Sequence, residues 1–502
     1  MPKITINGNE IEVKDGSTVI EAFKKSEQDI AHYCWHPALS IAGVCRLCMI
    51  EVEGNPKLQI ACNTVVTEGM KVSNQSEKVK DTVRWGMDFH LINHPLDCPI
   101  CDQAGECGLQ EQYMKYGQHD SSMSQSKVKK SKVVDLGEKI VLDSERCILC
   151  SRCVRFTDEV TKTNELGIFN RGDHSEIGTF GDKKLENDYA MNTVDICPVG
   201  ALTSKDFRFQ QRVWYLKDVE TTCPGCSTGC SVKVYYNNEG LFRVKPVEDA
   251  SVNGYWMCDE GRPLYKFANH KSRIKTFMKI QNGTPMPVNF KDVELELSNI
   301  FSSSEKVAFV LTGQNTNEEY SGLNTFIKSA NAKSDIYYWQ NNVDSFDSFD
   351  GLLKRGDKNP NTKGLLKSFS SMKKLSELNN SAAETIVVFA PENIFVYPDY
   401  DQIIESLNAS GKKIIFVGSQ TTTQLFQMPE GSILVPAKTF FEKNGTFTNY
   451  NNTERKVKKG ILLVRGAIDI LEFVDLCEMK FEPDALIKQR KFNEMAKERH
   501  VL

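Results

Sequence analysis

The sequence predicts a multidomain protein of mixed class, with α+β modules in its first half and an α/β domain in its second half. Three observations support this prediction. The chain has 502 residues, enough for several domains at roughly one per 150 residues. Fifteen of its 16 cysteines lie between Cys34 and Cys258, and only Cys477 follows them. Short apolar runs that alternate with helical patterns begin after about residue 271.

The composition excludes some classes of function. With 40% hydrophobic and 25% charged residues the chain has the composition of a folded soluble protein, and a net charge of −4 gives no reason to expect nucleic-acid binding. The sequence has no run of about 18 apolar residues and no apolar signal region at its start, so we expect no membrane span and no secretion. In a reducing compartment, cysteines this concentrated are expected to bind metal rather than form disulfides.

The first module is expected to be rich in β-structure. Residues 3–7 and 10–13 alternate apolar and polar positions around the turn Asn7-Gly8, and Ser17 is the expected cap of a short helix. Strands are predicted at 49–53 and 57–61. The first cysteine set, called the Cys34 set, has intervening gaps of ten, two and thirteen residues and consists of Cys34, Cys45, Cys48 and Cys62.

This spacing leaves two kinds of site open. The plant-type [2Fe–2S] pattern has a first gap of about four residues, so the loop here is longer. The β–helix–β frame and Gly43, which lets the backbone approach the sulfurs, favour a [2Fe–2S] cluster. Zinc is the alternative.

The second set follows a predicted helix at about 77–93. Proline and glycine break the backbone of residues 94–107, and the candidate ligands of this His94 set are His94, Cys98, Cys101 and Cys107. We expect an iron–sulfur cluster with one imidazole ligand, which removes a negative charge and raises the reduction potential. His90, one turn earlier, is the alternative histidine. We favour His94 because it is nearer the cysteines and adjoins Pro95, where a helix tends to end.

A polar, lysine- and serine-rich linker is expected at 121–132, and a run with the C-x2-C-x2-C spacing of ferredoxins comes after it. Thr157 stands where a two-cluster ferredoxin has its next cysteine, and Cys197-Pro198 follows after 43 intervening residues. We expect one [4Fe–4S] cluster and regard zinc as a poor rival. The ligands of this Cys147 set are Cys147, Cys150, Cys153 and Cys197. Whether the arginines around the run moderate cluster charge or are simply solvated stays open.

The fourth set has gaps of two, three and twenty-seven residues, which on spacing alone leaves a zinc ribbon open beside a [4Fe–4S] cluster. This Cys223 set consists of Cys223, Cys226, Cys230 and Cys258.

The rest of the chain is predicted to be α/β. Buried parallel strands are expected at 307–312, 385–390 and 412–418, with helices at 318–330 and 400–409. Gly313 and Gly418 follow strands, but the sequence has neither a dinucleotide fingerprint nor a P-loop, so close turns are the better interpretation. Cys477 is expected in the core, and 482–502 is expected to form a charged helix.

Two stretches show a specific resemblance. Residues 37–48 and 97–110 resemble signatures of the large iron–sulfur subunit of the proton-pumping NADH:quinone oxidoreductase, respiratory complex I. The Cys223 set, followed by Asp259-Glu-Gly-Arg262, and residues 436–449 are similar to parts of molybdopterin oxidoreductases. The resemblance is strong over residues 1 to about 270 and weak beyond.

The resemblance implies a domain order. It consists of a β-grasp [2Fe–2S] ferredoxin domain (1–78), a one-His/three-Cys [4Fe–4S] domain (79–120), a ferredoxin-like [4Fe–4S] domain (133–212), a molybdopterin-oxidoreductase-type [4Fe–4S] domain (216–272) and a shortened α/β domain without an active site (273–502). It implies one [2Fe–2S] and three [4Fe–4S] clusters on the sixteen residues of the four sets, with a mainly structural fourth cluster. It implies no molybdopterin and no catalytic residue.

The implied function is to relay single electrons from a flavin- and NADH-binding subunit through the clusters toward quinone. The implied partners are that subunit with its small [2Fe–2S] companion, a ferredoxin-like subunit with two [4Fe–4S] clusters, and quinone-proximal subunits. The implied location is peripheral, on the cytoplasmic side of the plasma membrane or the matrix side in mitochondria. Alternatives are a diaphorase-type subunit of an NAD-linked hydrogenase or formate dehydrogenase, an autonomous molybdenum enzyme, and a zinc scaffold.

Overall fold

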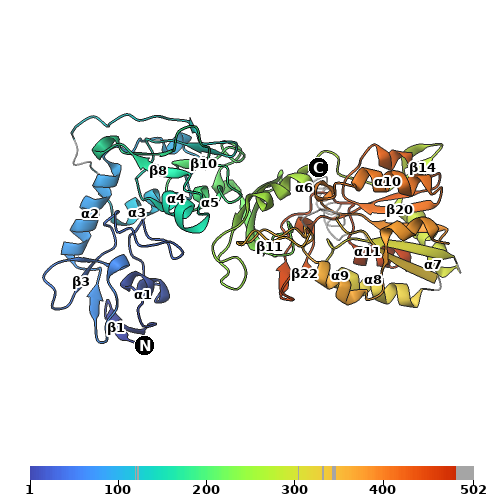
Figure 1. Ribbon diagram of the computed structural model, residues 1–502, viewed down its shortest axis with the longest axis horizontal. Helices are drawn as coiled ribbons and strands as arrows, with labels where there is room; N and C mark the ends of the chain where they lie inside the picture. Colours follow the sequence, from blue (N-terminus) through green and yellow to red (C-terminus); the bar gives the residue numbers. More distant parts are fainter. Residues whose placement is uncertain (119, 121–123, 304, 331–332, 342–345, 482–502) are drawn as a thin grey trace, which may run out of the picture. The chain divides into compact units, whose positions relative to one another are not determined.

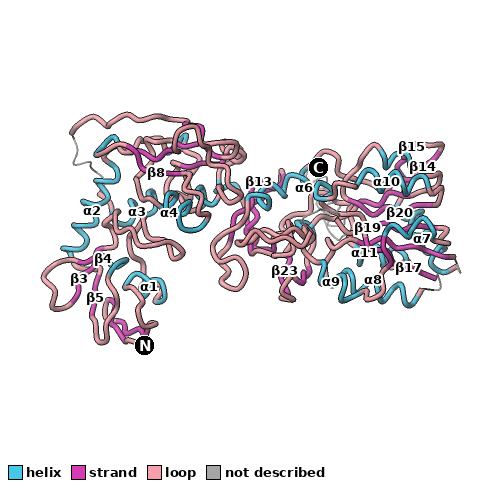
Figure 2. Tube along the Cα trace, viewed as in Figure 1, coloured by secondary structure: helices cyan, strands magenta, loops and turns pink. Residues whose placement is uncertain are grey.

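The computed structural model describes residues 1–481 except 119, 121–123, 304, 331–332 and 342–345. The helix expected at 482–502 lies outside the described residues. The chain forms two compact units, which are Met1–Leu216 with Tyr255–Asp259, and Lys217–Gly254 with Glu260 onward (Figures 1 and 2). Among the helices described, none has the length and apolar character needed to cross a membrane.

The first unit begins with a five-stranded sheet in the order β2-β1-β5-β3-β4. Its elements are β1 (Lys3–Ile6), β2 (Asn9–Glu12), α1 (Val19–Lys25), β3 (Met49–Val52), β4 (Gln59–Ile60) and β5 (Lys71–Ser73). The hairpin β1–β2 turns through Asn7 and Gly8, both at positive φ, as their sequence predicts. Strand β1 pairs in parallel with β5 in this sheet. The apolar face of α1 is buried.

The helix α1 begins one residue later than expected. Its cap is Thr18 rather than Ser17, because the Glu21 carboxylate accepts hydrogen bonds from the Thr18 N–H at 2.7 Å and the Thr18 hydroxyl at 2.9 Å. Ser17 instead uses its N–H in a turn to the carbonyl of Lys14. The capping box at Thr18 thus fixes the start of the helix.

Two helices bracket the His94 set. The helix α2 (Glu77–Leu91) begins at a Ser76 cap and ends just before the set, and α3 (Gly108–Tyr116) begins directly after Cys107. The described part of the expected linker, 124–132, is held in place: Lys127 Nζ donates to the carbonyls of Leu91 and Ile92 at 2.7 and 2.9 Å.

The remainder of the first unit consists of short elements around the Cys147 set. A three-stranded sheet in the order β10-β7-β6 and a hairpin β8–β9 surround two one-turn helices. These elements are β6 (Val134–Asp135), β7 (Ile140–Leu142), α4 (Arg152–Arg155), β8 (Leu166–Phe169), β9 (Glu176–Thr179), α5 (Asn192–Asp195) and β10 (Leu202–Ser204).

The second unit begins with an antiparallel sheet and continues into an eight-stranded sheet in the order β15-β14-β21-β20-β19-β16-β17-β18. The strands are β11 (Lys217–Thr222), β12 (Ser231–Asn237), β13 (Gly240–Pro246), β14 (Met278–Gln281), β15 (Thr284–Pro287), β16 (Lys306–Leu311), β17 (Lys333–Tyr338), β18 (Lys373–Lys374), β19 (Thr385–Phe389), β20 (Lys413–Gly418), β21 (Ile433–Pro436), β22 (Gly445–Thr448) and β23 (Glu454–Val457). The helices are α6 (Tyr265–Asn269), α7 (Phe290–Ser302), α8 (Asn317–Ser329), α9 (Thr362–Ser368), α10 (Tyr400–Ala409) and α11 (Ile470–Cys477).

The large sheet lies between two helical layers, as its apolar strands predict. Strands β16 to β21 pair in parallel, and alternate residues face opposite cores. Phe309 packs with α7, α8, α9 and α11 on one face, while Val310 packs with α10 on the other. Cys477, 3% exposed at the end of α11, belongs to the first of these cores, as expected.

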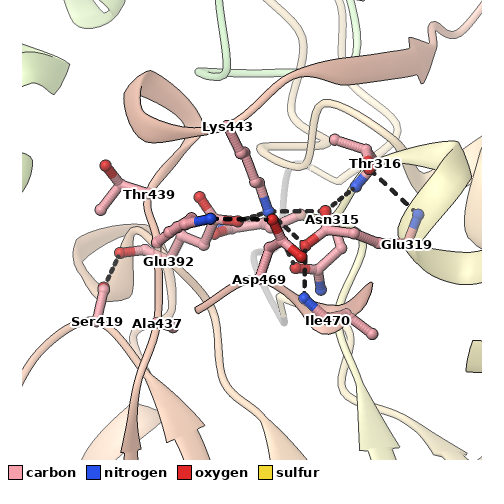
Figure 3. Close-up of polar contacts among 12 residues, drawn as sticks. Asn315, Thr316, Glu319, Glu392, Ser419, Ala437, Thr439, Lys443, Asp469 and Ile470 are labelled. Carbon is pink, nitrogen blue, oxygen red and sulfur yellow. Dashed lines mark hydrogen bonds and ion pairs between the residues drawn. The ribbon is translucent and has the colours of Figure 1, made fainter. Parts of the chain in front are cut away.

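The carboxyl ends of β16 and β19 carry a buried ionic network (Figure 3). Lys443 Nζ lies 2.8 Å from a Glu319 carboxylate oxygen and also pairs with Glu392. These two strands flank the point where the strand order reverses, which is where open α/β sheets bind ligands. In this chain the paired side chains of Lys443, Glu319 and Glu392 lie at this position.

Glu392 gives the network a pH dependence. Burial raises the pKa of Glu392 to about 8 from a usual 4.5, although Lys443 opposes the shift. The folded state therefore keeps a proton that the unfolded state loses between pH 4.5 and 8. Stability of the α/β domain is expected to fall as pH rises through this window, by up to about 1.4 kcal/mol per pH unit.

The variant Glu392→Gln removes that titration and is expected to make the stability of the α/β domain less dependent on pH in this window. Hydrogen exchange of peptides from β16 and β19, measured between pH 5 and 8 in urea and corrected for intrinsic rates, tests this. Glu384→Gln, at an exposed position, is the matched control and is expected to keep the slope. A slope unchanged in Glu392→Gln would contradict the assignment.

Candidate metal centres

The Cys34 set is assembled from one long loop and the helical turn Ala61–Asn63. All four cysteines are buried, with exposures of 5% or less. The Cys34 thiol lies beside the thiols of Cys45 and Cys62, and Cys62 also lies beside Cys48. The neighbouring thiols lower the pKa of Cys34 far below its usual range. The structure thus brings the four predicted ligands together.

The backbone of this loop turns its donors toward sulfur. Gly43 and Arg46 are both in the left-handed region, at φ +64° and +56°. The N–H groups of Val44 and Cys45 are directed at the Cys34 sulfur, and the Tyr33 N–H donates to Cys45 Sγ at 3.4 Å. Hydrogen bonds to sulfur stabilise thiolate ligands and tune a cluster's potential.

The His94 set lines a cavity of about 500 Å³, to which all four predicted ligands contribute. Cys107 caps the N-terminus of α3, and the N–H groups of Leu109 and Gln110 point at its sulfur. Cys98 is exposed, whereas Cys101 and Cys107 are buried. The cavity rim also exposes Leu96 and Met114, at 85% and 75%.

The structure brings His94, not His90, to this cavity. Nδ1 of His94 is buried and makes no hydrogen bond. Burial, and secondarily the charge of Arg146, lowers the pKa of His94 to about 4, so its imidazole is in the neutral form that binds metals. His90 Nε2 lies 3.1 Å from the Cys45 carbonyl oxygen, and its ring packs edge-on against Tyr33.

Two cations at the same cavity were not identified from the sequence. Arg146 and Lys127 both line it, and Arg146 pairs with Asp97 at 3.0 Å and with Asp143 at 3.2 Å. Arg146 directly precedes Cys147 and Asp97 directly precedes Cys98, and this adjacency is the only sequence signal for the contact. A charge beside the His94 set is therefore supplied by the segment that carries the next set.

The Cys147 set encloses a small space of about 20 Å³, lined by its four cysteines and by apolar side chains such as Leu142, Ile177 and Leu202. Burial raises the pKa of Cys147 to about 12 and that of Cys150 to about 11. Thiolates at these positions therefore require a bound cation, because ligation has to offset the cost of deprotonation. The residues present fit an iron–sulfur cluster.

The loop of the Cys147 set shares two backbone features with the loop of the Cys34 set, which are left-handed residues and an N–H that donates to sulfur. Leu149 and Ser151 are left-handed, at φ +55° and +60°, and the Leu149 N–H donates to Cys147 Sγ at 3.4 Å. Thr157, in place of a further cysteine, is fully buried and donates its hydroxyl to the Val154 carbonyl at 2.9 Å. That position is part of the core.

Three members of the Cys223 set lie on the loop between β11 and β12. Cys223, Cys226 and Cys230 are buried, and the Cys223 N–H donates to the Cys230 carbonyl at 2.8 Å. The loop is docked on the α/β domain, where the Ser227 N–H donates to the Asp357 carbonyl at 2.9 Å. Cys258 belongs to the segment of the other unit, so completion of this set stays a prediction.

Across the part of the chain that the structure describes, no three His, Cys, Asp or Glu side chains converge as the ligands of a single metal ion do. An iron–sulfur cluster has a different requirement, because its ligands are shared among several iron atoms, with one protein ligand per iron in [4Fe–4S] and two per iron in [2Fe–2S]. Its protein ligands surround the cluster rather than one ion.

Four protein-family models match the chain in sequence order. Residues 2–77 match a 2Fe-2S iron-sulfur cluster binding domain, and 86–122 match an NADH-ubiquinone oxidoreductase-G iron-sulfur binding region. Residues 137–203 match the ferredoxin-like domain of NADH-quinone oxidoreductase subunit 3, and 216–270 match a molybdopterin oxidoreductase Fe4S4 domain. The fold and these matches define a multidomain iron–sulfur protein with [2Fe–2S]- and [4Fe–4S]-binding domains.

Several curated relatives give a more specific match, because they are named as the G subunit of NADH-quinone oxidoreductase. The chain is 35% identical over 337 residues to that of Streptomyces coelicolor, which covers 66% of this chain and 40% of the relative. It is 38% identical over 287 residues to that of Mycobacterium bovis (57% and 36%) and 38% identical over 265 residues to that of Rickettsia felis (53% and 39%). This confirms the resemblance inferred from the motifs.

The matches have a limited extent. The aligned region spans about two fifths of the length of these relatives. Among solved structures, a chain of an NAD+-reducing [NiFe]-hydrogenase is similar over 42% of this chain and 91% of its own, at 29% identity and a TM-score of 0.39.

Gly200 tests the geometry of the His94 set. A Cβ at this position would lie 2.2 Å from Cys101 Sγ, so Gly200→Ala is expected to displace that thiol and remove one [4Fe–4S] signal. Gly178→Ala, in β9 of the same unit, is the control, because its Cβ would meet only the Phe169 ring at 3.3 Å. EPR with iron analysis of both variants is the measurement. A full set of signals in Gly200→Ala would contradict this geometry.

His94→Cys is expected to keep a cluster and to lower its reduction potential, because a thiolate adds a negative charge to the ligand set. The potential is measured by EPR-monitored redox titration. His90→Gln is the control and is expected to leave every potential unchanged. If no signal moves in His94→Cys, His94 is not a ligand.

Proposed function

We propose that this chain is an electron-transfer subunit of an NADH:quinone oxidoreductase of the complex I type. In this function it relays single electrons from a flavin- and NADH-binding subunit toward quinone. The observation that carries the proposal is the arrangement of the first unit, in which each of three predicted ligand sets is gathered around one loop or cavity. The names of the curated relatives support the choice of this complex.

The proposed cofactors are one [2Fe–2S] cluster on the Cys34 set and three [4Fe–4S] clusters on the other sets. When bound, such clusters supply one-electron transfer over a range of potentials. The protein residues hold thiolates and an imidazole at fixed positions, direct backbone N–H groups at sulfur and exclude water from most of each site. No residue is assigned a role as general acid, base or nucleophile.

The proposed partners follow from the same function. They are the flavin- and NADH-binding subunit with its small [2Fe–2S] companion, a ferredoxin-like subunit with two [4Fe–4S] clusters, and quinone-proximal subunits. Exposed Leu96 and Met114 beside the His94 set suit a contact with another protein, since exposed apolar side chains grouped at a site favour burial. Membrane contact would come through the complex, on the cytoplasmic or matrix side.

Metal and redox analysis test the proposal. Purified chain is expected to hold about fourteen iron atoms and matching sulfide, given one two-iron and three four-iron clusters. In the assembled complex, NADH is expected to reduce its EPR signals before quinone is reduced. Zinc in place of iron, stoichiometric molybdenum, or co-purification with a hydrogenase instead of a quinone reductase would overturn the proposed function.

A further inference from the structure

One arginine connects two of the predicted sites. Arg152 lies between Cys150 and Cys153, and its guanidinium donates to two backbone carbonyls. Nη2 lies 2.6 Å from the Trp35 oxygen and Nη1 lies 3.1 Å from the Ile196 oxygen. Trp35 follows Cys34 and Ile196 precedes Cys197. A single rigid guanidinium fork therefore ties a residue adjoining the Cys34 set to a residue adjoining the Cys147 set.

Neighbouring residues of the same segment reinforce this connection. Arg155 donates to the carbonyls of Cys34 and Ser40, and its Nε donates to the Ser151 hydroxyl at 3.2 Å. The Glu159 carboxylate accepts from the Ser40 N–H at 2.8 Å. The loop that carries Cys34 is thus held at four of its backbone groups by α4 and the turn after it.

The charge of Arg152 has no acidic partner among the described residues. Its recorded hydrogen bonds go to carbonyls, and its Nε is inaccessible to solvent and makes no hydrogen bond. The groups that face it electrostatically are thiols of both sets, Cys150 and Cys197 from one and Cys34 and Cys45 from the other, together with the imidazole of His32. A desolvated cation is costly unless an anion compensates it. Thiolate-ligated clusters on either side would supply that anion.

We infer that Arg152 is a positioning residue that fixes the Cys34 set relative to the Cys147 set and raises the reduction potential of a cluster at each. The inference deepens the proposed function and rests on it. A positive charge near two clusters favours the reduced, more negative state of both. The two potentials are therefore linked through one side chain, while the His94 set has its own cation in Arg146.

The test separates the charge of Arg152 from its geometry. Arg152→Gln keeps hydrogen-bonding capacity but removes the charge, and Arg152→Lys keeps the charge but loses the fork. Potentials are measured on the full chain by EPR-monitored titration. In Arg152→Gln we expect lower reduction potentials for both the [2Fe–2S] cluster and the cluster of the Cys147 set. The expected decrease is at least about 59 mV, which is a tenfold change in the equilibrium constant of a one-electron reduction. The reduction potential of the cluster on the His94 set should not change.

Arg152→Lys is expected to keep both potentials near the wild-type values. It is also expected to raise hydrogen exchange in the loop 34–42, because one ammonium cannot reproduce the two-carbonyl contact. Arg84→Gln, at an arginine of α2 paired with Asp81, is the control for loss of a positive charge elsewhere and should change neither measurement.

The outcomes distinguish the inference from the function on which it rests. Wild-type chain without iron overturns the proposed function itself. Full iron content in Arg152→Gln with both potentials unmoved overturns the inference and leaves the function standing. If Arg152→Gln does not fold or loses iron, the Arg152→Lys variant becomes the test. Hydrogen exchange in the loop 34–42 that equals the wild-type value would then overturn the positioning role.

Discussion

The arrangement of groups around the ligand sets of the first unit depends on the free-energy cost of placing negatively charged sulfur in a protein interior. Burial raises the pKa of the Cys147 thiol to about 12, so this environment by itself favours the neutral form. The loops of the Cys34 and Cys147 sets offset the cost by similar means, which are backbone N–H groups aimed at sulfur, left-handed residues that turn those groups inward, and arginines of the segment 152–155.

The parts of the fold that follow periodicity or spacing were predictable. The parallel strands of the second unit, its helices α8 and α10 and the burial of Cys477 follow from local patterns. The preference for His94 over His90 rested on its place beside Pro95, and the geometry agrees with it. The contacts of Arg146 with Asp97 and of Arg152 with Trp35 and Ile196 were beyond such reasoning, because a long side chain reaches residues that the fold brings near and the sequence keeps over 40 positions away. Local competition decided the cap of α1, where Glu21 selects Thr18 over Ser17.

The two units solve the problem of buried charge in different ways. In the first, Arg152 donates to carbonyls and faces thiols. In the second, Lys443 lies between the carboxyl groups of Glu319 and Glu392 at the strand ends, and Arg273 pairs with Glu442 at 2.7 Å. In the second, the cation has its acidic partners within the chain itself, whereas the first has a cation whose counter-charge has to come from a bound group. That difference separates a structural network from one prepared for a cofactor.

Of the twelve candidate ligands in the first three sets, Cys98 is the one whose residue is exposed. Exposure of a thiolate ligand admits oxidants, and oxidation of cysteine begins where thiolate character and access coincide. The His94 set would therefore be the first to decay in air when the chain is isolated. Covering by a neighbouring protein, as the proposed function requires, would extend the lifetime of its cluster, so the durability of this site would depend on that contact.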